Sequence, residues 1–206
     1  YFWGSDDDSS GLGKEDSENL MDLKLIHRIP KLYSKESCDK LINYFENNIN
    51  KAARGTYGDK ELNNLEIPIT ITNKEDFSNL GECLENGINH FKMQYPYIDT
   101  HITSWATVPS AQLCRYEPKN YYSTIHCEND GAKKNLRRVF AWMFFLNDIE
   151  EGGGTEFIFQ DYIAKPKAGD FYIWPAYWSH LHRGVSAPKE RKYILTGWCE
   201  YLCNDL

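Results

Sequence analysis

Two pairs of polar residues in the C-terminal half of the chain have the types and the spacing to bind a metal ion. His126 and Glu128 stand two residues apart in "IHCEND", and His180 and His182 stand two apart in "WSHLHRGV". Residues two apart on a β-strand point to the same face, so each pair could present both side chains to one site. Two histidines and one carboxylate can bind iron(II) on one triangular face and leave the other positions open. Strand parity does not decide whether His180 or His182 would complete such a set.

A lysine and a glycine-rich turn accompany these pairs. Lys192 lies ten residues beyond His182, and a lysine beside a metal site can bind a distal carboxylate as a point charge. Gly152–Gly154 precede Thr155, and such a run permits a tight turn and a close approach of backbones before a strand. Each feature alone is more often structural, so the prediction of a site depends on their joint occurrence in this order.

The elements that would position these residues follow from the hydrophobic pattern. Amphipathic helices are predicted at about 34–47 and 77–95, because apolar residues recur there at intervals of three and four. A first strand is predicted at 23–29. The Gly- and Asn-rich residues 53–70 are predicted to form mostly loop, which closes with a short apolar run at Ile67–Ile71. From residue 101 onward, short β-branched and aromatic runs between turn residues predict strands. These strands are 103–108, 111–117, 122–128, 138–147, 155–159, 170–174, 180–185 and 191–200.

About eight short strands with turns between them predict a β-sandwich, jelly roll or barrel. With helices packed on it, the expected fold class is α+β. We expect a single domain at 21–206, with N-terminal helices at about 21–100 and a β core at about 101–201. The opening "YFWGS" is interpreted as a tag remnant, and the rest of residues 1–20 as a flexible acidic segment.

The composition limits the classes of function. The 206 residues carry a net charge of −7, which disfavours nucleic acid as a partner despite the basic residues Lys133, Lys134, Arg137 and Arg138. No apolar run reaches the roughly 18 residues of a membrane span, and no signal peptide is visible. The six cysteines form no CxxC pair. We therefore expect an intracellular, cytoplasmic protein with reduced thiols and no membrane partner.

The motifs between residues 110 and 200 together resemble the 2-oxoglutarate- and iron(II)-dependent dioxygenases, and within them the prolyl 4-hydroxylase-like branch. The family pattern has His-x-Asp/Glu, an arginine, Leu-Asn at a strand end, Gly-Gly-x-Thr-x-Phe and Pro-x-x-Gly. A second histidine follows, then a lysine ten residues later and a tryptophan six after that. The individual motifs are weak, but the ordered set at matching intervals is specific. The matching residues here are His126-Cys127-Glu128, Arg138, Phe145-Leu146-Asn147, Gly152–Phe157, Pro166–Asp170, His182, Lys192 and Trp198.

The resemblance implies a double-stranded β-helix, or jelly roll, supported by N-terminal helices. It implies hydroxylation of an unactivated C–H bond, most often of a prolyl residue in a peptide or protein, with release of succinate and CO2. The implied cofactors are Fe(II) and the cosubstrate 2-oxoglutarate, with ascorbate as a candidate third. The implied residues are His126, Glu128 and His182 for the metal, Lys192, Tyr116 and Thr155 for 2-oxoglutarate, and Arg138, Trp198 and Tyr122 on the substrate side.

The carboxylate ligand departs from the usual family pattern. It is usually aspartate, and here it is Glu128, which is longer by one methylene, so the metal or the strand must shift slightly. Asp130 is an alternative ligand, but at four residues from His126 we expect it beyond the end of the strand.

Two assignments leave alternatives open. His180 could take the place of His182, although the ten-residue interval to Lys192 favours His182. The substrate-side tyrosine could be Tyr121 in place of Tyr122, because the register is uncertain by one residue.

Two other functions compete with prolyl hydroxylation. The first is the same chemistry on a free amino acid or another small molecule. The second is a non-catalytic metal-binding jelly-roll module. The joint presence of Lys192, Tyr116 and Thr155 argues against the second, because a module that binds only metal does not need a carboxylate pocket.

Overall fold

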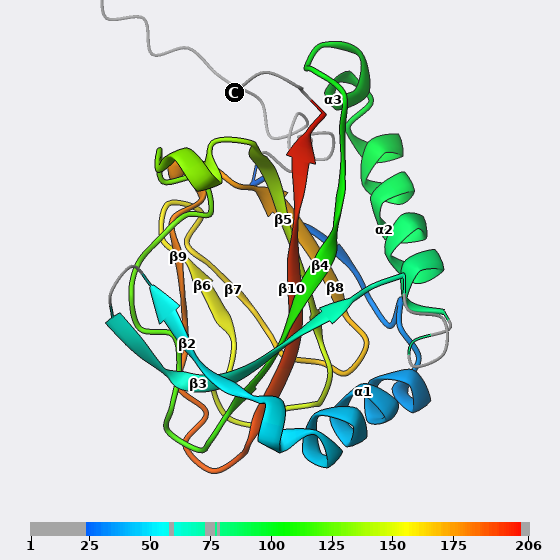
Figure 1. Ribbon diagram of the computed structural model, residues 1–206. Helices are drawn as coiled ribbons and strands as arrows, with labels where there is room; N and C mark the ends of the chain where they lie inside the picture. Colours follow the sequence, from blue (N-terminus) through cyan, green and yellow to red (C-terminus); the bar gives the residue numbers. More distant parts are fainter. Residues whose placement is uncertain (1–23, 58–59, 73–76, 78, 203–206) are drawn as a thin grey trace, which may run out of the picture.

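The computed structural model of the protein describes residues 24–57, 60–72, 77 and 79–202. The predicted tag remnant and acidic segment at 1–20 lie outside these residues. Within them, antiparallel strands dominate the C-terminal half, and the longer helices come earlier in the chain (Figure 1).

In the part of the chain that the structure describes, seven strands form one antiparallel sheet (Figure 1). In spatial order they are β1 (His27–Ile29), β8 (Phe171–Pro175), β5 (Arg138–Phe145), β10 (Lys192–Tyr201), β4 (Trp105–Tyr116), β3 (Lys60–Thr70) and β2 (Ala53–Tyr57). The spatial order differs from the chain order, so residues far apart in the sequence become neighbours. Strand β10 lies between β5 and β4, and its first residue, Lys192, pairs with Tyr116.

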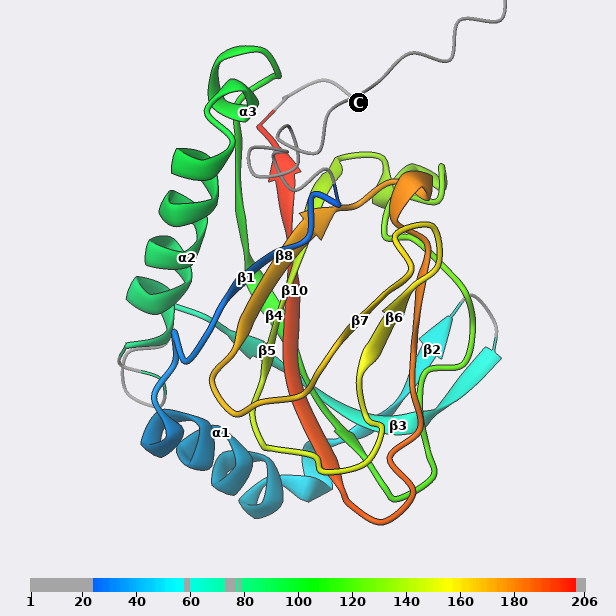
Figure 2. The same cartoon turned by 180° about the vertical axis from the view of Figure 1, so that it is seen from behind.

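Three further described strands form a smaller sheet that faces the first (Figures 1 and 2). Their spatial order is β7 (Tyr162–Ala164), β6 (Thr155–Phe157) and β9 (His182–Gly184). Phe157 of β6 packs in one buried cluster with Met143 and Phe145 of β5. Two facing antiparallel sheets with strands that alternate between them are the double-stranded β-helix, so the predicted α+β fold with a jelly roll is confirmed.

Helices α1 (Lys35–Asn47) and α2 (Leu80–Gln94) cover the outer face of the large sheet (Figure 2). Helix α1 begins where predicted, because the Ser34 side chain accepts a hydrogen bond from the Ser37 N–H at 3.1 Å. None of the described helices combines the length and the apolar character of a membrane span. The shorter helical segments are η2 (Ile49–Lys51), α3 (Tyr97–Thr100), η3 (Lys133–Asn135) and η4 (Trp178–His180), and the three η segments are 3₁₀ turns.

Strand β5 is buried on both faces. Phe140 and Phe144 belong to the cluster beneath the helices, whereas Met143 and Phe145 belong to the cluster between the two sheets. Full burial of each such side chain contributes about 1.5–3 kcal/mol. The sequence of a strand that is covered on both faces is a continuous apolar run, rather than an alternation of apolar and polar residues. This is why the pattern at 138–147 predicts a strand so clearly.

The prediction that residues 53–70 form mostly loop is wrong. They form β2 and β3, and β3 pairs with β4 from Asn64 to Thr70. Asparagine and glycine have low strand propensity, but pairing with an existing strand overrides that preference. Pro68 lies beyond Glu66, the last β3 residue paired with β2, so this part of β3 has only one described neighbour and tolerates a proline.

Other strand boundaries also differ from the predictions. The predicted strands 103–108 and 111–117 are one continuous strand, β4, which runs through Pro109. The predicted strand 180–185 narrows to β9, because residues 178–180 form the turn η4. Strand β7 was not predicted, since three residues carry too little alternation to be recognised.

Candidate active site

A single backbone bridge brings two distant histidines together. The His126 N–H donates to the His182 carbonyl at 3.0 Å, and the His182 N–H donates back to the His126 carbonyl at 2.9 Å. Antiparallel partners that exchange both bonds lie directly opposite each other, and the two imidazole ring centres are 4.3 Å apart. The prediction of a strand at 122–128 is therefore wrong, because outside the named strands this segment contributes an isolated bridge.

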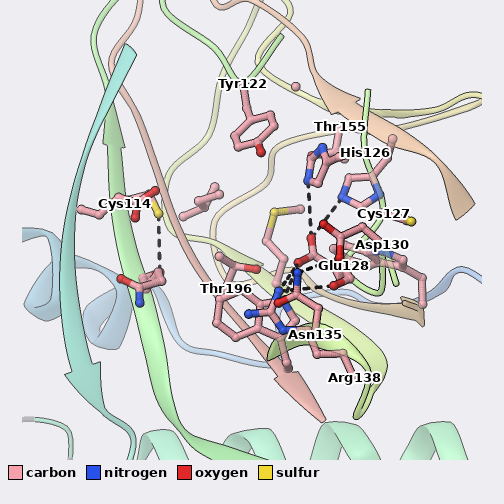
Figure 3. Close-up of a pocket in the computed structure, with 18 of the residues that line it drawn as sticks. Cys114, Tyr122, His126, Cys127, Glu128, Asp130, Asn135, Arg138, Thr155 and Thr196 are labelled. Atoms are coloured by element: carbon pink, nitrogen blue, oxygen red, sulfur yellow. Dashed lines mark hydrogen bonds and ion pairs between the residues drawn. The ribbon is translucent and has the colours of Figure 1, made fainter. Parts of the chain in front are cut away.

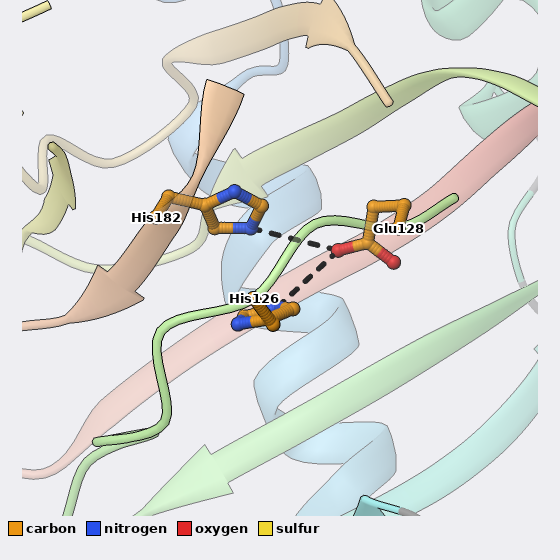
Figure 4. A group of neighbouring side chains, drawn as sticks. All are labelled: His126, Glu128 and His182. Carbon is orange, nitrogen blue, oxygen red and sulfur yellow. Dashed lines mark ion pairs between the residues drawn. The ribbon is translucent and has the colours of Figure 1, made fainter. Parts of the chain in front are cut away.

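Glu128 lies two residues after the bridge residue His126, and its carboxylate approaches both histidines (Figure 4). Its Oε1 lies 3.5 Å from Nε2 of His126 and 3.5 Å from Nε2 of His182. The Nδ1 atoms of the two rings lie 2.9 Å from the carbonyl oxygens of Thr124 and His180, respectively. A carbonyl can only accept, so each Nδ1 carries a proton, and each Nε2 can offer its lone pair to a metal ion when the imidazole is neutral. The three ligand atoms lie within 4.8 Å of one another and could hold a metal ion.

The electrostatics of this group keep the carboxylate ionised. Burial alone would raise the pKa of Glu128, but hydrogen bonds and charge from His126 and His182 outweigh burial and hold that pKa well below its ordinary value. Burial would lower the pKa of His126, but Glu128 outweighs it and raises that pKa. An anionic oxygen between two imidazoles suits a divalent cation.

The two alternative ligands have other partners. His180 Nε2 lies 2.8 Å from the Lys24 carbonyl, so the structure brings His182 and not His180 to Glu128. Asp130 accepts hydrogen bonds from the Ala132 N–H at 3.0 Å and from the Asn135 amide at 2.9 Å. Asp130 thus closes the turn before η3 and lies outside the group of three.

The residues predicted to bind 2-oxoglutarate lie on two strands of the large sheet and one strand of the small sheet. Lys192 of β10 faces Tyr116 of β4, with its Nζ 4.6 Å from the centre of the tyrosine ring, and Thr155 begins β6. All three are buried. Desolvation lowers the pKa of Lys192 from 10.5 to about 8, and no carboxylate of the described residues forms an ion pair with its ammonium. A buried cation without an anionic partner is a natural binding point for a carboxylate.

The glycine-rich turn fixes the start of β6. Gly152 has a φ of +71°, and a Cβ built on it would lie 2.0 Å from the Ser186 carbonyl oxygen. The Gly153 N–H donates to that same oxygen at 3.0 Å. Glycine is therefore required at the point where this turn packs against the chain after β9. The turn ends at Thr155, the first residue of β6 in the small sheet.

One cavity of about 540 Å³ connects the metal-ligand group with Lys192. Figure 3 shows its walls, with His126 and Glu128 at one side and Cys114 at the other. The cavity is lined by all nine residues that the resemblance implied: His126, Glu128, His182, Lys192, Tyr116, Thr155, Arg138, Trp198 and Tyr122.

The three residues implied on the substrate side lie close to the metal-ligand group. The Tyr122 ring centre is 4.3 Å from that of His126, whereas Tyr121 is not among the residues that line the cavity. Trp198 Nε1–H donates to Glu128 Oε2 at 2.5 Å. Arg138 stacks on the indole, with its guanidinium carbon 3.9 Å from the ring centre.

Sequence reasoning missed several residues that line the cavity. Glu66 was missed because it lies on β3, which was predicted to be loop. Gln112 alternates with Cys114 and Tyr116 along β4, so its period-two spacing from Tyr116 could have placed it on the same face. Asn135 belongs to the short turn η3, for which the sequence carries no comparable signal.

A comparison with protein families decides what this arrangement is. Residues 111–200 match the model of the 2OG-Fe(II) oxygenase superfamily. This part of the chain belongs to that superfamily. The matched range contains all nine implied residues, and it identifies the protein as a 2-oxoglutarate-dependent dioxygenase. A comparison with curated proteins gave no match.

Solved structures similar to this oxygenase include three prolyl hydroxylases. The viral collagen prolyl hydroxylase from Paramecium Bursaria Chlorella virus-1, in complex with 2OG, is 22% identical, with a TM-score of 0.65 over 89% of this chain and 99% of the other. A Pseudomonas putida prolyl-4-hydroxylase is 12% identical, with a TM-score of 0.66 over 87% and 94%. A Trichoplax adhaerens prolyl hydroxylase, in complex with a hypoxia inducible factor peptide fragment, is 11% identical, with a TM-score of 0.68 over 88% and 86%. At these identities the likeness shows the shared fold.

The residues of this oxygenase fit the cofactors that its superfamily implies. Two imidazole nitrogens and one carboxylate oxygen on one side of an open cavity are the donor set of non-haem iron(II) sites. The buried ammonium of Lys192, in the same cavity, fits the distal carboxylate of 2-oxoglutarate.

Proposed function

We propose that this oxygenase hydroxylates a prolyl residue of a peptide or protein and converts 2-oxoglutarate to succinate and CO2 in the same reaction. The observation that carries the proposal is the shared cavity. One wall presents His126, Glu128 and His182, and the same cavity contains the buried ammonium of Lys192. A site that bound only a metal would gain nothing from a buried cation beside it, because burial of an unpaired ammonium is unfavourable.

In this proposal each group of residues has one task. His126, Glu128 and His182 hold iron(II), while Lys192, Tyr116 and Thr155 hold the distal carboxylate of 2-oxoglutarate. Bound together, the metal and the cosubstrate supply the oxidising chemistry, which uses O2 to insert one oxygen atom into a C–H bond. The protein orients both reactants and excludes water from them. Ascorbate is a candidate reductant that keeps the iron in its active state.

The assignment of proline as the target rests on two lines of support. Tyr122 and Trp198 place flat aromatic surfaces beside the metal-ligand group, and such surfaces pack well against a pyrrolidine ring. The three similar structures named above are prolyl hydroxylases, and one of them contains a bound peptide. A cavity of about 540 Å³ accommodates 2-oxoglutarate and one substrate side chain together.

The decisive experiment measures iron(II)-dependent succinate formation with and without a proline-rich peptide. We expect slow turnover without the peptide, faster turnover with it, and a peptide product heavier by one oxygen atom. His182→Ala should abolish both reactions. A parallel reaction without ascorbate tests the need for that reductant.

Two other outcomes would change the proposal. Turnover that ignores every proline peptide but rises with a free amino acid or another small molecule would keep the oxygenase and replace its substrate. A metal-loaded protein that neither binds nor consumes 2-oxoglutarate would indicate a non-catalytic metal-binding module.

A further inference from the structure

The two carboxylate oxygens of Glu128 face different partners. Oε1 lies 3.5 Å from Nε2 of both His126 and His182. Oε2 accepts a hydrogen bond from Trp198 Nε1–H at 2.5 Å, and it lies 3.5 Å from Nη1 of Arg138. Oε1 therefore faces the two histidines, whereas Oε2 is bound by the indole N–H of Trp198 on β10.

Arg138 supports both the indole and the backbone that carries the carboxylate. Its guanidinium carbon lies 3.9 Å from the centre of the Trp198 ring, and its Nη1 lies 3.4 Å from the Glu128 carbonyl oxygen. Such a stack fixes the plane of the indole, and hence the direction of its N–H. Trp198 itself is anchored by its place in β10, opposite Ala141 of β5.

Glu128 needs such support more than a strand residue would. It follows the isolated bridge at His126, and it belongs to none of the described strands. Glutamate also has one more rotatable bond than aspartate, which is the usual carboxylate ligand in this family. A free glutamate could turn both oxygens towards a metal and occupy a position that the cosubstrate or O2 requires.

We propose that Trp198, with Arg138 stacked on it, is a positioning residue that holds Glu128 as a one-oxygen metal ligand. The proposal rests on the proposed iron site and extends it. The indole N–H occupies Oε2, so only Oε1 is free for the metal, and the other metal positions stay open. The extra methylene of glutamate is what lets the carboxylate reach the indole. An aspartate at position 128 is shorter by about 1.5 Å and cannot keep both contacts.

The test measures Mn²⁺ affinity of the metal-free protein, by electron paramagnetic resonance of free Mn²⁺, without 2-oxoglutarate or turnover. Trp198→Phe keeps an aromatic ring for Arg138 but removes the N–H. We expect it to weaken Mn²⁺ binding about 10- to 100-fold, as loss of a hydrogen bond to a metal ligand does elsewhere. Unchanged affinity in Trp198→Phe would overturn the proposal.

Trp142→Phe is the matched control. Its indole Nε1 is buried and makes no hydrogen bond within the described residues, and the residue belongs to the cluster beneath the helices rather than to the cavity. It reproduces the loss of ring size and of an N–H without touching Glu128. We expect its Mn²⁺ affinity to stay within about twofold of the unaltered protein. An equal loss in both variants would mean that general loosening of the fold, and not the N–H, weakens binding.

A double-mutant cycle makes the test specific for the glutamate. In a Glu128→Asp background, the carboxylate no longer meets the indole, so Trp198→Phe should cost less than about threefold in Mn²⁺ affinity. An undiminished cost in that background would show that Trp198 acts by another route. Failure of the iron site itself is distinguishable, because the unaltered protein would then not bind Mn²⁺ at all.

Discussion

Lys192 and Tyr116 face each other across β10 and β4, with the lysine Nζ 4.6 Å from the centre of the tyrosine ring. Both side chains are buried, and no carboxylate among the described residues pairs with the ammonium. The ring face compensates only part of the lost hydration, and desolvation lowers the pKa of Lys192 to about 8. The ammonium is therefore placed to bind a carboxylate that comes from outside the chain.

The affinity for 2-oxoglutarate should fall at alkaline pH. Below a pKa of about 8, Lys192 is charged before the ligand arrives; above it, binding must be accompanied by uptake of a proton. The affinity should therefore decrease by up to about tenfold per pH unit above the pKa, until the pKa of Lys192 in the complex is reached. Calorimetry on Mn²⁺-loaded protein in two buffers of different ionisation enthalpy measures both the affinity and the proton uptake. A flat affinity without proton uptake would contradict this role of Lys192.

Lys192→Met should stabilise the protein while it abolishes 2-oxoglutarate binding. The pKa of Lys192 is lower in the folded state than its ordinary value of 10.5, so the unfolded chain holds the proton more tightly. The charge thus destabilises the fold below about pH 8, and this penalty disappears as the pH rises from about 8 to about 10.5. Methionine should raise the free energy of unfolding at neutral pH by about 1–3 kcal/mol.

Urea unfolding of the two proteins at neutral and at alkaline pH measures this effect. The advantage of methionine should shrink at alkaline pH, where the lysine is neutral in the folded state. A variant that is less stable than the unaltered protein at neutral pH would show that Lys192 has a stabilising anionic partner.

The local part of the site could be predicted from the sequence. The apolar run of β5, the glycines before Thr155 and the interval between His182 and Lys192 are short-range patterns. Each has a local physical cause, such as burial on both faces or a turn with positive φ. These patterns suffice to predict a fold of short antiparallel strands, and the family resemblance that they carry together implies the jelly roll and the metal-ligand residues.

The long-range part could not be predicted. The bridge between His126 and His182 joins segments 56 residues apart in the numbering, and no local pattern at 122–128 distinguishes it from a strand. Strand β3 contains Ile67 and Ile69, which favour extended structure, but its asparagine-rich part is a strand because it pairs with neighbouring strands. The contact of Trp198 with Glu128 joins β10 to the segment that follows this bridge. The resemblance therefore implied a substrate-side role for Trp198 without its link to the carboxylate.

The two histidines of "WSHLHRGV" should respond differently to replacement. His182→Ala removes a ligand nitrogen and should lower Mn²⁺ affinity by at least about 100-fold. His180→Ala removes the contact with the Lys24 carbonyl and should cost about 1–3 kcal/mol of stability with metal affinity retained. Mn²⁺ titration and urea unfolding of both variants separate the two roles. Loss of metal binding in His180→Ala, at a temperature where that variant is folded, would refute the assignment.

Asp170 should be important for stability rather than for chemistry. It is 1% exposed, and its carboxylate accepts hydrogen bonds from Arg28 Nε at 2.8 Å and from the Lys31 N–H at 3.0 Å. It thereby ties the segment around β1 to the residue before β8. Asp170→Ala leaves a backbone donor and an arginine without their acceptor, and should lower the free energy of unfolding by about 2–4 kcal/mol. Urea unfolding measures the loss, and hydrogen exchange should show it as faster exchange of β1 amides.

Asp39→Ala provides the control for Asp170. Asp39 pairs with Lys35 on the surface of α1, and both side chains are about half or more exposed. Such a pair contributes little, so the variant should change stability by less than about 0.5 kcal/mol. Equal small effects in the two variants would mean that β1 is held by its pairing with β8 alone. A large loss only in Asp170→Ala would show that the Pro166–Asp170 motif closes the edge of the large sheet, because the carboxylate at its end anchors the neighbouring strand.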